Sequence, residues 1–263
     1  MRLAAAVSAV ALGAVASAGL AAWRADATAV RPAGSLPVEL AGERLVAPAF
    51  AIPAARPLEP RRGATVWAPV LRPTLARAGP GVRFPRLALV RPRTPEGTTN
   101  LVVALRRHQA ARRLWVQVRL AVLPNGATGW IRRDALGGYV VVRTHLVIDL
   151  HRLTATLMRG RRVVLRASIG VGQPRWPTPR GHFYVRDRLT EFGNPFYGPI
   201  AFGTSARSPV LTDWPNGGYI GIHGTNQPRL IPGRISHGCI RLRNRDIRRL
   251  AQLMPIGTSI TIT

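Results

Sequence analysis

The only cysteine of this 263-residue chain, Cys239, has a histidine sixteen positions before it, His223. That spacing is too long for one face of a helix, so the fold must bring the two side chains together. A thiol beside an imidazole acts as a nucleophile once its proton has been removed. The sequence therefore predicts Cys239 as a nucleophile and His223 as its base.

Glycine and positive charge surround the cysteine. Gly238 precedes it and frees the backbone to direct N–H groups at a developing oxyanion. Nearby positive charge lowers the pKa of a thiol, so we expect Cys239 to be held as a thiolate. The alternative is an inert core cysteine, which is common for a lone one, but Cys239 does not lie in an apolar strand. The arginines of this interval are Arg229, Arg234, Arg241, Arg243 and Arg245.

No carboxylate lies between Asp213 and Asp246. A paired-carboxylate glycosidase or a triad oriented by aspartate is therefore hard to build locally. If His223 is the base, we expect a main-chain carbonyl, that of Gly224, to hold its other ring nitrogen.

Zinc is the rival chemistry for the same residues. The candidate ligands are His182, His223, His237 and Cys239. They lack the close spacing of paired ligands, and the surrounding positive charge disfavours a cation. We expect neither a metal nor another cofactor.

The net charge is +27, from 38 basic and 11 acidic residues, and the chain contains no lysine. Lysine-dependent sites, such as a Schiff base, a P-loop or a Ser-x-x-Lys pair, are therefore excluded. A cationic surface attracts polyanions, which leaves nucleic acid, anionic membrane and anionic cell-wall polymers as partners. Basic and aromatic residues are not interleaved, which argues against nucleic acid.

The N-terminal residues 1–27 have the layout of a secretory signal peptide. Arg2 precedes a long run of small apolar residues, and Ala16–Ala18 and Ala25–Ala27 offer small-residue cleavage sites. An uncleaved membrane anchor is the alternative, because the run approaches the length that spans a bilayer. Residues 28–60, rich in Pro and Ala, are expected to be an extended linker.

Residues 61–136 are predicted to form a small β domain and 137–263 a second one, with Gly137-Gly138 between them. In the first, strand-like Leu114–Leu120 is followed by a turn and by Thr128–Ile131, which resembles the closing strands of SH3-like barrels.

The second domain begins with short strands that alternate apolar and polar residues. We expect Pro174–Gly218 to supply lids or binding loops, and Tyr219–Ile222 to be a strand that delivers His223. Asn244 is the predicted N-cap of a helix over Arg245–Met254, and a last strand covers Ser259–Thr263.

The motif His223-Gly224, followed by Ser236-His237-Gly238-Cys239-Ile240-Arg241-Leu242 and then by Asn244 and Asp246, is similar to the signature of L,D-transpeptidase catalytic domains of the YkuD type. Gly170–Gly172, Pro177–Phe183 and Gly203–Ser205 also match, so the resemblance extends over 139–263. Some members have Asn where this chain has Arg241. The resemblance implies a mainly β chain, with a YkuD-like β-sandwich catalytic domain that has one short helix after the cysteine. A small SH3-like β-barrel would precede it.

The resemblance also implies roles. Cys239 would attack a tetrapeptide stem of peptidoglycan to form a thioester, and His223 would activate the acceptor amine of a second stem, giving a 3→3 crosslink. His237, Gly238 and the Cys239 amide would line the oxyanion region. The predicted substrate contacts are Ser236, Arg241, Tyr219 and Asn244, with Tyr219 covering the pocket.

Two alternatives remain open. With water as acceptor the protein would be an L,D-carboxypeptidase, and without catalysis it would be a cell-wall-binding module. In each case we expect an exported protein that contacts peptidoglycan stem peptides and anionic wall polymers.

Overall fold

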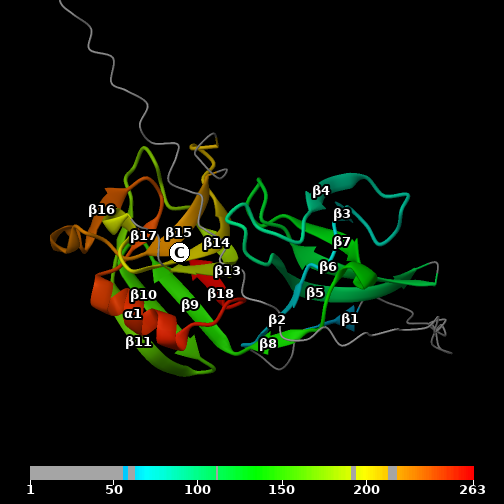
Figure 1. Cartoon of the computed structure of the whole chain (residues 1–263), viewed down its shortest axis with the longest axis horizontal. Coiled ribbons are helices and arrows are strands. Elements are labelled where there is room, and N and C mark those ends of the chain that lie inside the picture. The colour runs from blue at the N-terminus through cyan, green and yellow to red at the C-terminus, as the bar shows by residue number, and fades with distance from the viewer. Residues whose placement is uncertain (1–55, 59–62, 111, 191–193, 213–217) are drawn as a thin grey trace, which may run out of the picture. The chain divides into compact units, whose positions relative to one another are not determined.

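The computed structural model describes residues 56–58, 63–110, 112–190, 194–212 and 218–263, all of which belong to one compact unit, Ala47–Thr263. The predicted signal segment and most of the predicted linker lie outside these residues. Within the described part the chain forms two β-sheets and one α-helix (Figure 1).

The first sheet is antiparallel and has the strand order β4-β3-β7-β6-β5-β2-β8, with β1 paired to β5. Its strands are β1 (Arg56–Pro57), β2 (Thr65–Pro69), β3 (Thr74–Arg77), β4 (Arg86–Val90), β5 (Leu101–Ala110), β6 (Arg113–Arg119), β7 (Thr128–Arg132) and β8 (Val140–Val142). Val116 and Val118 of β6 are buried on either side of the partly buried Gln117 and contribute to a separate apolar core. The sheet extends past Gly138, because β8 pairs with β2. Its likeness to an SH3-like barrel stays a prediction.

The second sheet is mixed, with the order β11-β10-β9-β18-β13-β14-β15-β17-β12-β16. Its strands are β9 (Thr144–Asp149), β10 (Thr154–Arg159), β11 (Arg162–Ser168), β12 (Gly170–Gly172), β13 (Gly181–Thr190), β14 (Ile200–Arg207), β15 (Tyr219–His223), β16 (Gly233–Ser236), β17 (Ile240–Arg241) and β18 (Ser259–Ile262). Parallel pairing joins β9 to β18, β15 to β17 and β12 to β16. Apolar side chains from both the early and the late strands share one core, so the ends of this segment fold together.

The segment Pro174–Gly218 differs from its prediction as a region of lids and loops. It contains two of the longer strands, β13 and β14, which pair antiparallel with each other. Phe183, Val185 and Phe202 from these strands are buried in the core. The Pro and Gly residues that favoured a loop lie mainly at the strand ends, where they do not interrupt the pairing.

The helix α1 (Asn244–Leu253) follows the cysteine and buries Ile247 and Leu250. The prediction that Asn244 caps it is wrong. Arg243 occupies the N-cap position without a side-chain capping bond, and Asn244 is the first helical residue. The predicted class, mainly β with one short helix, is confirmed for the described residues.

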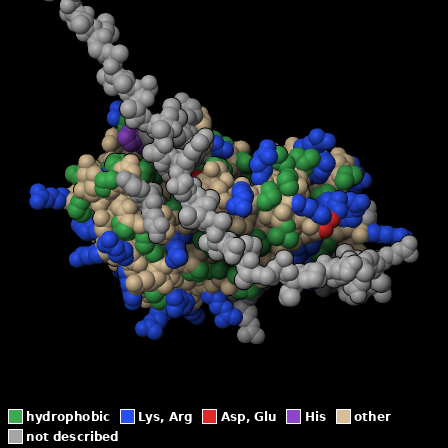
Figure 2. Space-filling view, viewed as in Figure 1, with side chains coloured by type: hydrophobic (Ala, Val, Ile, Leu, Met, Phe, Trp, Pro, Cys, Tyr) green, Lys and Arg blue, Asp and Glu red, His purple; other side chains and the backbone are tan. Residues whose placement is uncertain are grey.

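Arginine side chains are spread over the face shown in Figure 2, and few acidic side chains are visible there. This agrees with the net charge of +27. Among the described residues, no helix is both long and apolar enough to cross a membrane.

Candidate active site

Parallel pairing of β15 with β17 brings His223 and Cys239 together. Ile222 lies opposite Ile240 and His223 opposite Arg241, so Cys239, which directly precedes β17, lies next to Gly221. The Gly221 N–H points at the Cys239 sulfur, with N and Sγ 3.4 Å apart. A Cβ on Gly221 would lie 3.8 Å from both Cys239 Sγ and His223 Cδ2. The strand pairing therefore places the thiol and the imidazole around one glycine, which leaves room for both.

The imidazole of His223 has a defined tautomer. Its Nδ1 lies 2.6 Å from the carbonyl oxygen of Gly224, the partner expected from the sequence. Because a carbonyl only accepts hydrogen bonds, Nδ1 carries the proton and Nε2 keeps its lone pair. Burial lowers the pKa of His223 to about 4, against an opposing effect of the Gly224 hydrogen bond and with a further lowering by Arg241. The ring is therefore a neutral base at neutral pH.

The thiol of Cys239 is protonated at rest, so the prediction of a stable thiolate is wrong. Burial raises the pKa of Cys239, and this outweighs the Gly221 N–H and the charge of Arg241, which both lower it. The sequence showed the arginines but not the desolvation. The resting pair is thus a thiol and a neutral imidazole, which suits proton transfer to His223 during attack rather than a preformed ion pair.

The turn before Cys239 is held by two hydroxyl groups. Ser236 Oγ donates to the Cys239 carbonyl over 2.6 Å and accepts from the Gly238 N–H over 3.1 Å. Thr178 Oγ1 donates to the Gly238 carbonyl over 2.8 Å, and Gly238 has φ +112°, a conformation that favours glycine. Since Ser236 engages the Gly238 N–H, we expect the Cys239 N–H to be the main oxyanion donor of this turn. Ser236 thus fixes the shape of the turn, and its predicted contact with substrate stays a prediction.

His237 lies at the rim of this turn with its side chain exposed. Its ring stacks on Trp176 with 3.9 Å between the ring centres, and the guanidinium of Arg175 lies 3.6 Å from the centre of the Trp176 ring. Desolvation and the charges of Arg175 and Arg241 lower the pKa of His237. Its predicted place in the oxyanion region stays a prediction. The ring contact joins this turn to the segment that carries Trp176.

Arg241 is 4% exposed and has no counter-ion among the described residues. Its guanidinium carbon lies 4.3 Å from the centre of the Phe196 ring, and its Nε is buried without a hydrogen-bond partner in the described part of the chain. Burial lowers its pKa, while Cys239 and Tyr197 raise it. A buried cation beside Cys239 with no anion among the described residues is suited to bind one.

Two aromatic residues beside His223 were not predicted from the sequence. They lie in the turn Pro195–Tyr197. The centre of the Tyr197 ring is 5.0 Å from the centre of the His223 ring, and that of Phe196 is 6.2 Å from it. Burial raises the pKa of Tyr197, Cys239 raises it further, and Arg241 opposes both effects. The Pro- and Gly-bounded run around these rings indicated a functional loop, but it gave no sign of which side chains face the imidazole.

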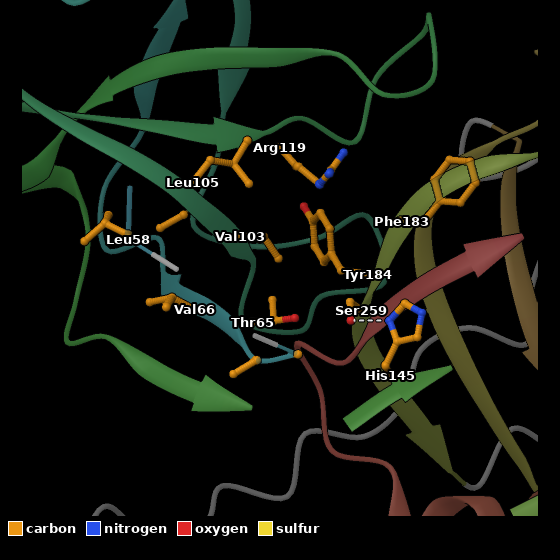
Figure 3. A pocket seen from close by; sticks show the side chains of 13 residues that line it. Leu58, Thr65, Val66, Val103, Leu105, Arg119, His145, Phe183, Tyr184 and Ser259 are labelled. Atoms are coloured by element: carbon orange, nitrogen blue, oxygen red, sulfur yellow. Dashed lines mark hydrogen bonds between the residues drawn. The ribbon is translucent and has the colours of Figure 1, made fainter. Parts of the chain in front are cut away.

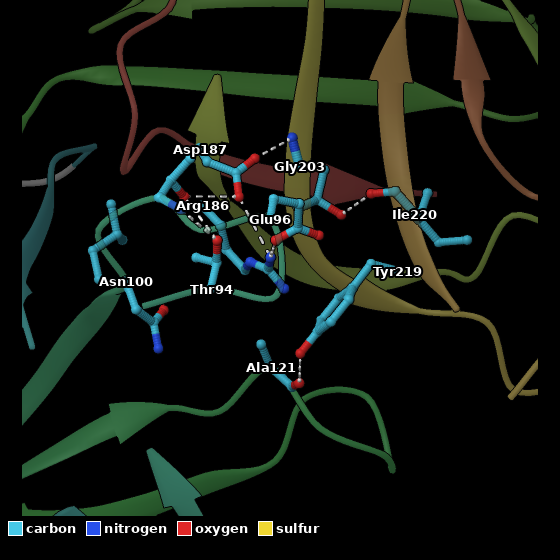
Figure 4. Close-up of polar contacts among 12 residues, drawn as sticks. Thr94, Glu96, Asn100, Ala121, Arg186, Asp187, Gly203, Tyr219 and Ile220 are labelled. Carbon is cyan, nitrogen blue, oxygen red and sulfur yellow. Dashed lines mark hydrogen bonds and ion pairs between the residues drawn. The ribbon is translucent and has the colours of Figure 1, made fainter. Parts of the chain in front are cut away.

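Two predicted substrate contacts are engaged elsewhere. The Tyr219 hydroxyl donates to Ala121 O over 3.1 Å, and its ring lies 3.9 Å from the guanidinium carbon of Arg186 (Figure 4). Tyr219 therefore packs toward the first sheet and does not supply the predicted cover of the pocket. Asn244 Oδ1 accepts from the Thr225 N–H over 2.9 Å.

The candidate zinc ligands are not grouped into a metal-binding cluster in the described part of the chain. Among the described residues, no three His, Cys, Asp or Glu side chains are grouped so that they could hold a metal. His182 is on β13, where its Nδ1 lies 3.1 Å from Thr261 Oγ1.

Two cavities lie elsewhere in the compact unit, and neither is lined by Cys239 or His223. One of about 270 Å³ includes His145, whose Nδ1 lies 2.7 Å from Ser259 Oγ (Figure 3). The other, of about 280 Å³, is lined in part by Arg119, Arg186 and Tyr219.

Part of the chain is similar in sequence to known proteins. Residues 143–262 match the sequence model of YkuD, the L,D-transpeptidase catalytic domain. The match covers somewhat less than half of the chain and includes His223 and Cys239.

Individual relatives match over part of their length. The chain is 36% identical over 118 residues to "Putative L,D-transpeptidase YkuD" of Bacillus subtilis, which is 45% of this chain and 65% of the relative. It is 52% identical over 46 residues to "Probable L,D-transpeptidase YbiS" of Escherichia coli, 16% of this chain and 15% of that protein. The match thus spans less than two thirds of the relatives' own length. A solved catalytic domain of an Enterococcus faecium L,D-transpeptidase is 26% identical, with 46% of this chain and 96% of that chain covered and a TM-score of 0.36.

Proposed function

We propose that this protein is an exported L,D-transpeptidase that joins peptidoglycan stems through a thioester on Cys239. The observation that carries the proposal is the combination of a thiol and a neutral imidazole around Gly221 with the unpaired, buried Arg241 beside them. The match of residues 143–262 to the L,D-transpeptidase catalytic domain supports the choice of a peptidoglycan stem as substrate.

In the first half-reaction, His223 Nε2 accepts the thiol proton as the sulfur attacks the carbonyl carbon between the third residue of a donor tetrapeptide and its terminal D-alanine. The Cys239 N–H stabilises the oxyanion of the tetrahedral intermediate. Collapse of the intermediate breaks the peptide bond, and the leaving amine of D-alanine takes the proton from His223. The product is a thioester between Cys239 and the donor stem.

In the second half-reaction, the side-chain amine of the third residue of another stem attacks the thioester. His223 accepts the proton of this amine and returns it to the departing sulfur, which regenerates the thiol. The new amide is a 3→3 crosslink. Arg241 binds a carboxylate of the stem through a charge-assisted hydrogen bond.

Three features support action outside the cytoplasm. The N-terminal 27 residues have a signal-peptide layout, the surface is cationic, and the reaction needs no nucleotide. An anionic wall matrix attracts such a surface. N-terminal sequencing of the protein from wall and membrane fractions distinguishes a cleaved signal from a retained anchor, and a cytoplasmic protein would contradict export.

Product analysis tests the reaction. The full chain is incubated with a disaccharide-tetrapeptide, and the products are separated by mass. We expect crosslinked dimers, loss of all product in Cys239→Ala, and loss of most turnover at neutral pH in His223→Ala. Tripeptide without dimers would instead assign an L,D-carboxypeptidase. Turnover by Cys239→Ala would overturn the proposed nucleophile.

A further inference from the structure

The side chain of Asn244 lies where three segments of the site meet. Its Oδ1 accepts a hydrogen bond from the Thr225 N–H over 2.9 Å. A Cβ at Gly198 or at Gly224 would lie 2.4 Å from the same oxygen, so both backbones approach the carboxamide more closely than any other residue type allows. Gly198 also has φ +65°, which glycine adopts readily.

One peptide unit connects Asn244 to the imidazole. The N–H of Thr225 and the C=O of Gly224 belong to the same planar group. Asn244 holds the N–H end, and the C=O end accepts from His223 Nδ1 over 2.6 Å. Because the group is planar, fixing its N–H end also fixes the direction of its carbonyl. Hydrogen bonds in such a chain polarise and strengthen one another.

The same oxygen is close to the turn that packs on the imidazole. Gly198 directly follows the turn Pro195–Tyr197. The centre of the Tyr197 ring is 5.0 Å from the centre of the His223 ring. Asn244 therefore contacts the backbone of two segments that hold His223. One is the Gly224–Thr225 peptide, which orients Nδ1, and the other is the turn that packs on the ring.

We propose that Asn244 is a positioning residue for His223, which acts through the Gly224–Thr225 peptide to keep Nδ1 protonated and Nε2 free. This inference rests on the proposed role of His223 as base, and it replaces a substrate contact for Asn244. It explains why the first residue of α1 is polar although it does not cap the helix.

Three variants of the full chain test the proposal. Asn244→Ala removes the acceptor at a helical position that alanine tolerates well. Asn244→Asp keeps an acceptor oxygen at the same place. Arg245→Ala is the matched control, because Arg245 is the next residue of the helix and is exposed.

Two readouts report on His223 without any peptidoglycan substrate. The first is the set of imidazole ¹⁵N shifts, assigned to His223 by comparison with His223→Gln, which distinguish the two tautomers. The second is the rate at which iodoacetamide alkylates Cys239. We expect Asn244→Ala to populate both tautomers and to slow alkylation about tenfold, as for the loss of one oriented hydrogen bond. Asn244→Asp should restore both readouts, and Arg245→Ala should match the wild type.

Unchanged shifts and an unchanged rate in a folded Asn244→Ala variant would overturn the proposal. If that variant does not fold, amide exchange in the wild-type protein decides: a Thr225 N–H protected like the amides of β15 supports the bond, and a rapidly exchanging one contradicts it. Failure of the proposed transpeptidase reaction would leave these results unaffected, since neither readout uses a stem peptide.

Discussion

Two arginines of the compact unit are buried against an aromatic ring, Arg186 on β13 and Arg241 on β17. Arg186 is 2% exposed with its guanidinium carbon 3.9 Å from the centre of the Tyr219 ring, and Arg241 is 4% exposed at 4.3 Å from that of Phe196. In each, Nε is buried without a hydrogen-bond partner among the described residues. Packing and burial are therefore alike in the two regions.

The charges around them differ. Arg186 Nη2 lies 2.6 Å from Glu96 Oε2 and 3.4 Å from Asp187 Oδ2 (Figure 4). Burial acts to lower the pKa of Arg186, but Glu96 and the other acidic groups outweigh it and raise the value. Burial lowers the pKa of Arg241, and only Cys239 and Tyr197 oppose that effect.

We infer from this difference that Arg186 is structural, whereas Arg241 is available to bind an anion. Arg186 has two acidic partners, and one of them, Glu96, lies in the loop between β4 and β5. The ion pair therefore ties this loop to β13. Arg241 has no anion among the described residues and lies beside Cys239, the proposed nucleophile, where a substrate carboxylate would pair with it. Burying the unpaired charge of Arg241 costs stability, and the protein tolerates this cost at the place where we expect a charged ligand to bind.

The largest effect on stability is expected at the paired arginine. Glu96→Leu leaves Arg186 buried with one carboxylate fewer, which should lower the free energy of unfolding by about 4 kcal/mol. Urea denaturation measures it. The control is Asp134→Asn, which breaks only exposed ion pairs and should cost no more than about 1 kcal/mol. Equal losses in the two variants would remove the distinction between the regions.

The second prediction concerns pH at the unpaired site. Because burial lowers the pKa of His223 to about 4, the folded state favours the neutral ring. The neutral His223 ring contributes fully to the free energy of unfolding above the unfolded-state pKa of about 6.5. As the pH falls toward 4 this contribution is lost, and the free energy of unfolding decreases by roughly 3 kcal/mol. Urea denaturation across this range, with His223→Gln as reference, should show the variant losing less stability than the wild type. Parallel curves would contradict a buried neutral imidazole.

The third prediction sharpens the comparison at Arg241 itself. Arg241→Met keeps an apolar chain against Phe196 but removes the charge, so kcat/KM for the tetrapeptide donor should fall about a hundredfold. Stability should stay the same or rise, because no anion of the described chain is left unpaired. Arg245→Met, an exposed change four residues later, should leave both unchanged. A loss of stability with activity intact would show that Arg241 is structural, like Arg186.

The smallest effect is spectroscopic. Since burial raises the pKa of Cys239, thiolate absorbance in the ultraviolet should appear only above the ordinary thiol value of about 8.5, with Cys239→Ala subtracted as background. Thiolate already present at neutral pH would show that Arg241 outweighs burial and would restore the stable thiolate expected from the sequence.

The sequence predicted the residues of the site better than their environment. Cys239, His223 and the Gly224 carbonyl could be identified from residue types and spacing, because a thiol, a base and the lack of a local carboxylate leave few arrangements. Alternation of apolar and polar residues predicted strands such as β10, and a short apolar run predicted β15.

Properties that depend on tertiary contacts could not be predicted. The raised pKa of Cys239 depends on desolvation by strands distant in the sequence. The contacts of Tyr197 and Asn244 depend on loops that cross only in the folded chain. Local propensity placed Asn244 as a helix cap, whereas the competing bond to the Thr225 N–H determines its orientation.

The central claim, that Cys239 carries the acyl group, is tested most directly by intact-mass measurement and peptide mapping after brief incubation of the full chain with a tetrapeptide donor. We predict that the mass rises by that of the donor stem without its terminal alanine, that the adduct maps to the peptide containing Cys239, and that hydroxylamine releases it. Turnover of the donor with no adduct on that peptide would contradict the account.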